Sequence, residues 1–218
     1  AADENCSFFK DRLVVFRSAL LSASMKAGSN AEFHNHNDLG HFSIWYGEKP
    51  LIVDAGAGVY TKKYFSAERY TLWNTRGKGH NAPVFDNMEQ ESGKQYTASL
   101  NLVPGQVGTA VCNLSRSYPE AVGVTGFTRT MRFAPDRIRI EDHFQLKQPR
   151  KTRIHLLCAV QPQIDGRRIL FGEVALLLEN LEYVSQGKID APDCPFTELV
   201  LEATAEQYRM EFSVLKKN

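Results

Sequence analysis

The sequence contains no long hydrophobic run, and this absence argues against a membrane-spanning helix. A helix that crosses a bilayer needs about 18 or more consecutive apolar residues, and no stretch of these 218 residues approaches that length. Internal repeats, low-complexity linkers and a long amphipathic helical pattern are missing as well. With 43% hydrophobic and 23% charged residues, the composition is that of an ordinary globular protein, for which we expect no membrane partner.

Cysteine is scarce and scattered. Cys6, Cys112, Cys158 and Cys194 form neither C-x-x-C pairs nor a dense framework, so we expect buried free thiols, although disulfides are compatible with the even number. None of them adjoins a histidine in sequence, which leaves a cysteine nucleophile without local support.

An excess of one charge sign is also lacking, except in one segment. The net charge of +1 argues against nucleic acid as a general partner. In residues 60–80, however, five basic residues stand against one acidic residue and are interleaved with aromatic residues. Basic groups pair with sulfate or carboxylate, and aromatic faces pack on sugar rings, so this segment is a candidate site for an anionic sugar chain. Its candidate contact residues are Tyr60, Lys62, Tyr64, Arg76 and Lys78.

This basic segment is compatible with two further roles. A solvated basic loop with some aromatic residues in the core fits the composition equally well. Single-stranded nucleic acid would use the same ingredients, but the neighbouring histidines favour a sugar.

The histidines gather just before a predicted hairpin. Three of the six, His34, His36 and His41, fall within eight positions. Residues 42–46 and 51–54 are aromatic and β-branched runs on either side of a turn at 47–50, which predicts two paired strands. In an antiparallel pair, the segment before the first strand lies beside the end of the second. We therefore expect His34, His36 and Asp54 to converge.

Imidazole and carboxylate groups are ligands that zinc-type metals favour, and a site with three protein ligands keeps one position open. A further ligand is needed, and His80 is the natural candidate. It lies between Gly79 and Asn81 in a glycine-broken loop, where backbone freedom lets a side chain reach a distant partner. The alternative is that these histidines only brace a loop through hydrogen bonds.

Residues beside the histidines could orient a metal ligand. Metal-bound imidazoles usually need such a partner, and Asp38, His41 and Asn81 are candidates for that task. Asp38 could instead cap the turn that presents the metal ligand in this loop. We expect His143 and His155, inside predicted strands, to be ordinary structural residues.

Beyond residue 95 the sequence predicts strand after strand. Polar and apolar residues alternate in several runs, such as residues 137–144. Turn residues recur between the runs, so we predict an all-β fold, an antiparallel β-sandwich, in one domain. The one segment that could form a short helix is residues 66–73. The predicted strands cover residues 96–103, 108–115, 126–134, 137–144, 152–160, 168–172, 173–179, 196–203 and 208–215.

The run HNHNDLGHFSIWYGEKPLIVDAGAGVY, followed by GHNAP and then Gln90, resembles the signature of heparinase II/III-like polysaccharide lyases. The resemblance extends upstream through LVVFRSALLSASMKAGSNAEF and, less closely, downstream to the strand-rich tail. Members of that family carry an N-terminal α/α toroid followed by a β-sandwich, and the signature belongs to the sandwich. The resemblance implies that residues 1–218 are this C-terminal β-sandwich domain, with the catalytic toroid absent from the chain.

Carried over residue by residue, the resemblance implies that His36, Asp54 and His80 bind one structural zinc ion (Zn²⁺), with water as the fourth ligand. It makes His34 the catalytic histidine. Such enzymes cleave uronic-acid polysaccharides by β-elimination, and a protonated His34 would stabilise the developing enolate. The remaining catalytic groups come from the toroid, so we expect the chain alone to be inactive or nearly so.

We therefore expect the metal-binding domain of a periplasmic or secreted polysaccharide lyase. Its expected partners are an acidic polysaccharide, with or without sulfate, and the N-terminal toroid of the same protein. A noncatalytic carbohydrate-binding module with a structural metal is one alternative. A cupin-type metal oxygenase is disfavoured, because Gly28, His34 and His36 match the opening of the cupin motif but His41 stands where a glutamate is expected.

Overall fold

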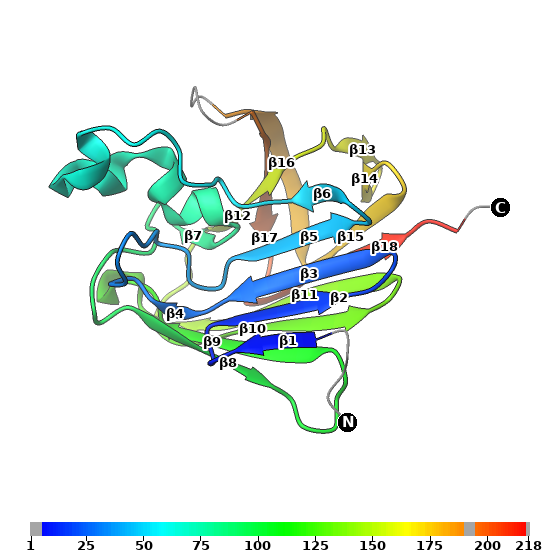
Figure 1. Ribbon diagram of the computed structural model, residues 1–218, viewed down its shortest axis with the longest axis horizontal. Coiled ribbons are helices and arrows are strands. Elements are labelled where there is room, and N and C mark those ends of the chain that lie inside the picture. The colour runs from blue at the N-terminus through cyan, green and yellow to red at the C-terminus, as the bar shows by residue number, and fades with distance from the viewer. Residues whose placement is uncertain (1–5, 190–194, 217–218) are drawn as a thin grey trace.

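The computed structural model describes residues 6–189 and 195–216, which form two antiparallel β-sheets stacked as a sandwich (Figure 1). The predicted all-β fold is confirmed. The helices of the described residues are short 3-10 segments, and none has the length and apolar character needed to span a bilayer.

The first sheet carries the hairpin beside the histidines. Its central strands are β5 (Phe42–Tyr46) and β6 (Lys49–Ile52), and β6 in turn pairs with β12. The full order is β1 (Cys6–Phe9), β2 (Leu13–Arg17), β3 (Leu21–Lys26), β5, β6, β12 (Thr152–Cys158), β17 (Thr197–Ala203) and β16 (Leu181–Lys188), with β7 (Pro83–Phe85) paired to β12.

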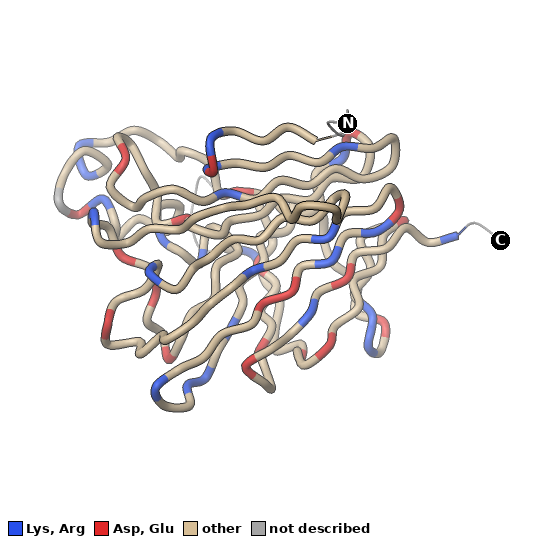
Figure 2. Tube along the Cα trace, turned by 90° about the horizontal axis from the view of Figure 1, so that it is seen from below, with Lys and Arg blue, Asp and Glu red and all other residues tan. Residues whose placement is uncertain are grey.

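The second sheet consists mainly of the strands predicted beyond residue 95. Its order is β13 (Gln163–Asp165), β14 (Arg168–Phe171), β15 (Val174–Glu179), β18 (Gln207–Val214), β11 (Arg137–Leu146), β10 (Val124–Ala134), β9 (Thr109–Arg116), β8 (Thr97–Leu102) and β4 (Gly28–Ser29). Every run predicted beyond residue 95 contains a strand of one sheet or the other. Basic and acidic residues are interspersed along the strands (Figure 2), so the sheets do not carry one dominant charge sign.

The hairpin of β5 and β6 forms as predicted, but its turn is shorter. Tyr46 pairs with Lys49, so only Gly47 and Glu48 lie between the strands. The prediction placed Pro50 in the turn, yet it pairs with Trp45 inside β6. Gly47 makes the tight turn possible through its positive φ of 54°. Pro50 is tolerated because β6 pairs with β12 only farther along, through Ile52 and Cys158.

The segment between β6 and β7 folds into a lobe of 3-10 helices that projects from the sandwich at the upper left of Figure 1. The short helix predicted at residues 66–73 is therefore broken into turns. Ser66, Leu72 and Arg76 have extended backbones at the breaks, and the Ser66 side chain caps the second turn. The turns are η1 (Lys63–Phe65), η2 (Ala67–Thr71), η3 (Trp73–Thr75) and η4 (Gly77–His80), with η5 (Glu120–Val122) elsewhere.

Apolar side chains of both sheets fill the space between them, and one buried ion pair joins this core to the histidine loops. Arg129 and Asp142 are fully buried and bind each other through two hydrogen bonds of 2.6 and 2.7 Å. Arg129 also donates to the carbonyl oxygens of Gly40, at 2.6 Å, and Asn81, at 3.1 Å. The second sheet thus holds the two loops that carry His36 and His80.

The expected free thiols are found among the described residues. Cys112 and Cys158 are buried free thiols, and Cys6 is partly exposed. Cys194 lies outside the described residues.

Candidate metal site

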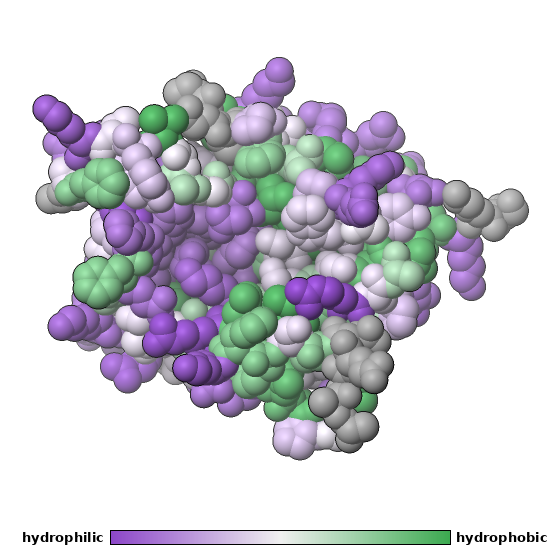
Figure 3. All heavy atoms as spheres, viewed as in Figure 1, coloured by the Kyte–Doolittle hydropathy of each residue, from purple (hydrophilic) through white to green (hydrophobic). Residues whose placement is uncertain are grey.

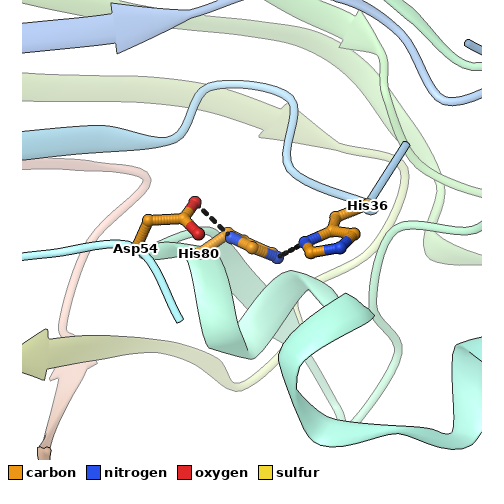
Figure 4. Close-up of side chains that lie close together, drawn as sticks. All are labelled: His36, Asp54 and His80. Carbon is orange, nitrogen blue, oxygen red and sulfur yellow. Dashed lines mark hydrogen bonds and ion pairs between the residues drawn. The ribbon is translucent and has the colours of Figure 1, made fainter. Parts of the chain in front are cut away.

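Three loops bring His36, Asp54 and His80 together. His36 lies in the loop before β5, Asp54 follows the end of β6, and His80 is the last residue of η4. Each can offer one ligand atom within 4.8 Å of the others. Figure 4 shows His80 between the other two side chains, with Asp54 on one side and His36 on the other.

A row of hydrogen bonds connects these side chains. His80 Nδ1 lies 2.8 Å from Asp54 Oδ2, and His80 Nε2 lies 3.2 Å from His36 Nδ1. The Nε2 atom is also 2.9 Å from the carbonyl oxygen of Asn74. Asp54 Oδ1 accepts a hydrogen bond of 2.7 Å from the Gly56 amide. His80 is fully buried, so its ring is held from both ends within the protein.

The environment sets the charges of these groups. Burial and the neighbouring His80 lower the pKa of His36 to about 4, so His36 is neutral near pH 7. Burial works against charge on Asp54, but the hydrogen bond and charge of His80 outweigh it and lower the pKa of Asp54. Burial opposes charge on His80 as well, yet its bond to Asp54 raises the pKa of His80. A neutral imidazole therefore stands near a carboxylate, as metal binding requires.

The donor set fits a zinc ion. Two nitrogen ligands at roughly 2.0–2.1 Å from zinc, with a tetrahedral angle between them, are about 3.3 Å apart. The separation of His36 Nδ1 and His80 Nε2 is 3.2 Å. Asp54 Oδ2 meanwhile accepts from the opposite nitrogen of His80 and orients its ring, so direct binding of zinc by Asp54 would require its carboxylate to give up this hydrogen bond. Two imidazoles and one carboxylate are also a common zinc ligand set.

His34 does not join this cluster. Its side chain is exposed and packs edge-on against Phe65, with ring centroids 6.3 Å apart. The expected convergence therefore holds for His36 and Asp54 and not for the His34 ring. A left-handed backbone at His34, with φ of 57°, turns the chain between the two histidines. His34 remains available to a molecule outside the domain.

Asp38 and His41 surround the cluster without contacting its rings through hydrogen bonds. Asp38 is buried and forms an ion pair of 2.5 Å with Lys26. His41 Nδ1 lies 3.0 Å from the backbone oxygen of His80, and His41 Nε2 lies 3.7 Å from Asp54 Oδ2. His41 thus holds the backbone that presents His80, and burial lowers its pKa.

Asn81 joins three strands beside the cluster. Its side-chain amide donates to the carbonyl oxygens of Phe42, at 2.9 Å, and Val53, at 3.0 Å. Its side-chain oxygen accepts from the Leu157 amide at 2.8 Å. Asn81 is fully buried and directly follows His80, so these bonds hold the end of η4 against the first sheet.

The fold separates the residues predicted to contact a sugar chain. Tyr60 is 60% exposed and Lys62 is exposed as well, whereas Tyr64 is only 1% exposed and contacts His36. Arg76 is ion-paired with Glu89. Arg76 and Lys78 face a different place, a pocket of about 250 Å³ whose lining residues are Arg76, Lys78, Val84, Asp86, Asn87, Glu89, Lys151, Arg153 and His155.

Exposed aromatic residues that the sequence did not single out lie near His34. Phe33 is fully exposed and Phe65 is 62% exposed, with the Phe65 and Tyr60 rings 5.5 Å apart. Figure 3 shows apolar groups beside a hydrophilic hollow on the left of this face, between the 3-10 lobe and the loop before β5. No periodic signal marks these residues in the sequence, since they lie in irregular loops.

Arg69 is the other residue that sequence reasoning missed. Its guanidinium contacts the backbone of His34 and Asn35 and the hydroxyl of Tyr64. In the sequence it is one of several basic residues in the same segment, and nothing in the spacing distinguishes it from Arg76.

Comparison with protein families and solved structures gives a consistent result. The family model described as "Heparinase II/III-like, C-terminal" matches residues 13–207. A comparison with curated proteins gives no match.

The fold is similar to part of several larger chains. A mutant of the heparan sulfate lyase HepC from Pedobacter heparinus superposes with a TM-score of 0.75 at 16% identity, over 100% of this chain and 37% of that one. A heparinase III with methylated lysines gives a TM-score of 0.74 at 18% identity, over 97% of this chain and 35% of that one. At these identities the likeness shows the fold alone, and the chain spans little more than a third of those structures.

Proposed function

Because the chain belongs to the heparinase II/III-like, C-terminal family, we propose that it is the metal-binding domain of a polysaccharide lyase that acts on acidic, uronic-acid-containing polysaccharide. The observation that carries the proposal is the cluster of His36, Asp54 and His80 within a chain of this family. We also propose that the protein is periplasmic or secreted, because it would encounter such polysaccharides there.

In this proposal zinc is structural. His36, Asp54 and His80 would hold it, and each comes from a different loop. A bound ion contributes its binding free energy to folding. The zinc ion would connect the loop before β5 to the end of β6 and to η4. The residues around His36 would then keep one conformation.

The proposed reaction is β-elimination. A base removes the proton on the carbon next to the uronate carboxyl group, and that C–H electron pair forms a double bond. The C–O bond to the 4-linked sugar breaks, and its electron pair goes to the leaving oxygen, which takes up a proton from an acid. Negative charge develops on the carboxyl group during proton removal. An imidazolium on exposed His34 can donate a hydrogen bond to this carboxylate, and such a donor stabilises the transition state more than the ground state.

The rest of the catalytic set would come from another domain. The chain spans 35–37% of the similar lyase chains, and we propose an N-terminal α/α toroid as its partner within the same protein. The exposed residues Tyr60 and Lys62 are proposed to contact the sugar chain beside His34, and Arg76 and Lys78 to contact it at their separate pocket. The chain alone is then expected to show little or no turnover.

A noncatalytic carbohydrate-binding module is the second candidate. It is favoured by the exposed aromatic rings of Tyr60 and Phe65, which can stack on sugars without any chemistry. In that case the metal would still brace the loops, but His34 would have no chemical role.

The two candidates differ in what His34→Ala does to a longer protein that contains this chain and its partner domain. For a lyase, we expect formation of unsaturated uronate to fall at least about 100-fold, the size of effect seen when one charge-stabilising donor is removed. Zinc content should not change, because the His34 ring lies outside the cluster. His143→Ala is the matched control, since His143 is an exposed histidine of β11. Full activity of His34→Ala would remove the catalytic assignment.

A further inference from the structure

One guanidinium group holds the backbone of the short stretch that carries the two loop histidines. Arg69, in η2, uses Nη2 to donate to the backbone oxygens of His34 and Asn35, both at 2.8 Å. The same nitrogen lies 3.2 Å from the Tyr64 hydroxyl. Its Cζ atom stands 4.2 Å from the centroid of the Tyr64 ring, close enough for a cation–π contact. Arg69 therefore connects the backbone at His34 to Tyr64.

Tyr64 in turn contacts the ring of His36. The Tyr64 hydroxyl lies 2.7 Å from His36 Nε2, and the two rings meet nearly edge to face, with centroids 6.2 Å apart. Tyr64 is 1% exposed, so water does not readily replace this bond. The opposite nitrogen of His36, Nδ1, faces His80.

The surrounding acceptors determine which nitrogen of His36 carries the hydrogen. His80 faces an acceptor at each nitrogen, Asp54 at Nδ1 and the Asn74 carbonyl at Nε2. His36 Nδ1 and His80 Nε2 face each other, so only one of the two nitrogens can carry a hydrogen. With the Tyr64 oxygen as acceptor at His36 Nε2, the hydrogen of neutral His36 lies on Nε2, and Nδ1 is left to accept from His80. The lone pair of Nδ1 then points toward the place where the cluster converges.

We propose that Tyr64 and Arg69 are positioning residues, Tyr64 fixing the tautomer and ring orientation of His36 and Arg69 fixing Tyr64 together with the backbone that presents His34. This inference rests on the proposed function insofar as it assigns a metal to His36. It gives Tyr64 a role behind the cluster, whereas the sequence suggested a contact with sugar. It also gives one residue, Arg69, an influence on both histidines of the loop.

The size of the effect follows from known metal sites. Removing a group that orients a metal-bound imidazole lowers metal affinity by about 10–100-fold. Tyr64→Phe keeps the ring and its packing but leaves the Nε2 hydrogen of His36 without an acceptor. Arg69→Lys keeps the charge but shortens the side chain and removes the planar guanidinium that lies over the Tyr64 ring.

The first test measures zinc affinity of the chain by competition with a chromogenic chelator. We expect Tyr64→Phe to bind zinc about 10–100-fold more weakly than the unchanged chain, and Arg69→Lys to bind it more weakly as well. Tyr70→Phe is the matched control. Its hydroxyl comes from the same helical segment and donates to the Asn35 side chain at 2.9 Å, without contacting a histidine. Tyr70→Phe should leave the affinity unchanged.

The second test reads the His36 tautomer directly, by nitrogen-15 NMR of the zinc-free chain. The unchanged chain and Tyr70→Phe should show the hydrogen on Nε2, whereas Tyr64→Phe should show a mixture of both tautomers. A merely structural role for Tyr64 would change stability and leave this signature unaltered. Unaltered tautomer and affinity in Tyr64→Phe would overturn its part of the inference, and unaltered affinity in Arg69→Lys would overturn the other part.

The two tests also separate this inference from the proposed function. If the unchanged chain binds no zinc, the metal assignment fails. The tautomer measurement on the same zinc-free sample still decides whether Tyr64 positions His36.

Discussion

At the residue scale, single polar side chains attach the loops of this fold to strands that the backbone has already paired. Asn81 is the clearest case, because its side chain bridges β5, the end of β6 and β12, and its backbone oxygen accepts from buried Arg129. Its left-handed φ of 57° lets the chain turn directly after His80. The residue that follows the candidate ligand thus fixes where that ligand stands.

We expect Asn81→Ala to lower the free energy of unfolding by about 3 kcal/mol or more. Each buried group left without a partner costs about 1–3 kcal/mol, and alanine in the left-handed region adds about 1–2 kcal/mol. Asn87 also has a left-handed backbone, with φ of 71°, but its side chain is exposed. Asn87→Ala therefore reports the backbone cost alone in urea unfolding. Equal losses in the two variants would show that the three bonds of Asn81 contribute little.

The clustered histidines and the predicted hairpin led to the expectation that His34, His36 and Asp54 converge, with His80 as a further ligand. The resemblance to heparinase II/III-like lyases then implied His36, Asp54 and His80 as the metal ligands. The expectation for the His34 ring was wrong, since the left-handed backbone at His34 itself turns the chain before His36. Tyr64 could not be placed either, because its burial depends on how four short helical turns fold over one another. Such turns carry no periodic hydrophobic signal.

At the element scale, the 3-10 lobe is the part of the molecule that depends most on the cluster. The sheets are held by continuous strand pairing, as between β10 and β11. The lobe between β6 and β7 has short turns, side-chain bonds and isolated backbone bonds such as that from the Asn37 amide to the Thr75 carbonyl, and its last turn ends at His80. Regions with few regular hydrogen bonds open at lower free-energy cost than paired strands.

Metal removal should therefore loosen the lobe before the sheets. In limited digestion with trypsin, a chelator is expected to speed cleavage at Lys62, Lys63 or Arg69, while amide exchange in the paired strands stays slow. His36→Ala is the control, because a variant that holds no metal should be cleaved quickly with or without chelator. Cleavage that does not respond to chelator in the unchanged chain would argue against a metal that braces the lobe.

The strands were predictable wherever alternation was strong. Residues 137–144 show alternating polar and apolar residues, and β11 covers them. The edge strand β16 was not predicted, because most of its side chains are exposed and its sequence contains Ser185 and Gly187. In β3, buried Leu21, Ala23 and Met25 do alternate with polar residues, so the signal was present there. The hairpin turn was predicted too long because proline is typical of turns. Pro50 instead lies in β6, at a position where the strand has an open edge and the missing N–H of proline is tolerated.

At the scale of the whole molecule, the two sheets and the loops around the cluster form one connected structure. The link is Arg129, which is paired with Asp142 on the neighbouring strand of the second sheet; both are fully buried, and the Tyr208 hydroxyl is bound to the same carboxylate. Through Gly40 and Asn81, this pair reaches both histidine loops. A substitution at this buried pair should therefore also affect the cluster of His36, Asp54 and His80.

Asp142→Asn tests this connection. Removing one partner of a buried pair leaves an uncompensated charge, which typically costs about 3–5 kcal/mol. The neighbouring Glu141 pairs with Arg132 and Arg209 at the surface, at 3.2 and 2.9 Å, and Glu141→Gln should cost no more than about 1 kcal/mol. Chemical unfolding of both variants gives the comparison. Similar small losses would mean that the buried pair does not connect the sheets energetically.

The most direct test of the proposed metal site is elemental analysis of the purified chain, beside His36→Ala, His80→Ala and the control His143→Ala. We expect close to one zinc per chain in the unchanged protein and in His143→Ala, and a loss of zinc in the other two variants. Zinc retained by His36→Ala and His80→Ala, or no metal in the unchanged protein, would contradict this expectation, and the histidines would then only brace the loops through hydrogen bonds.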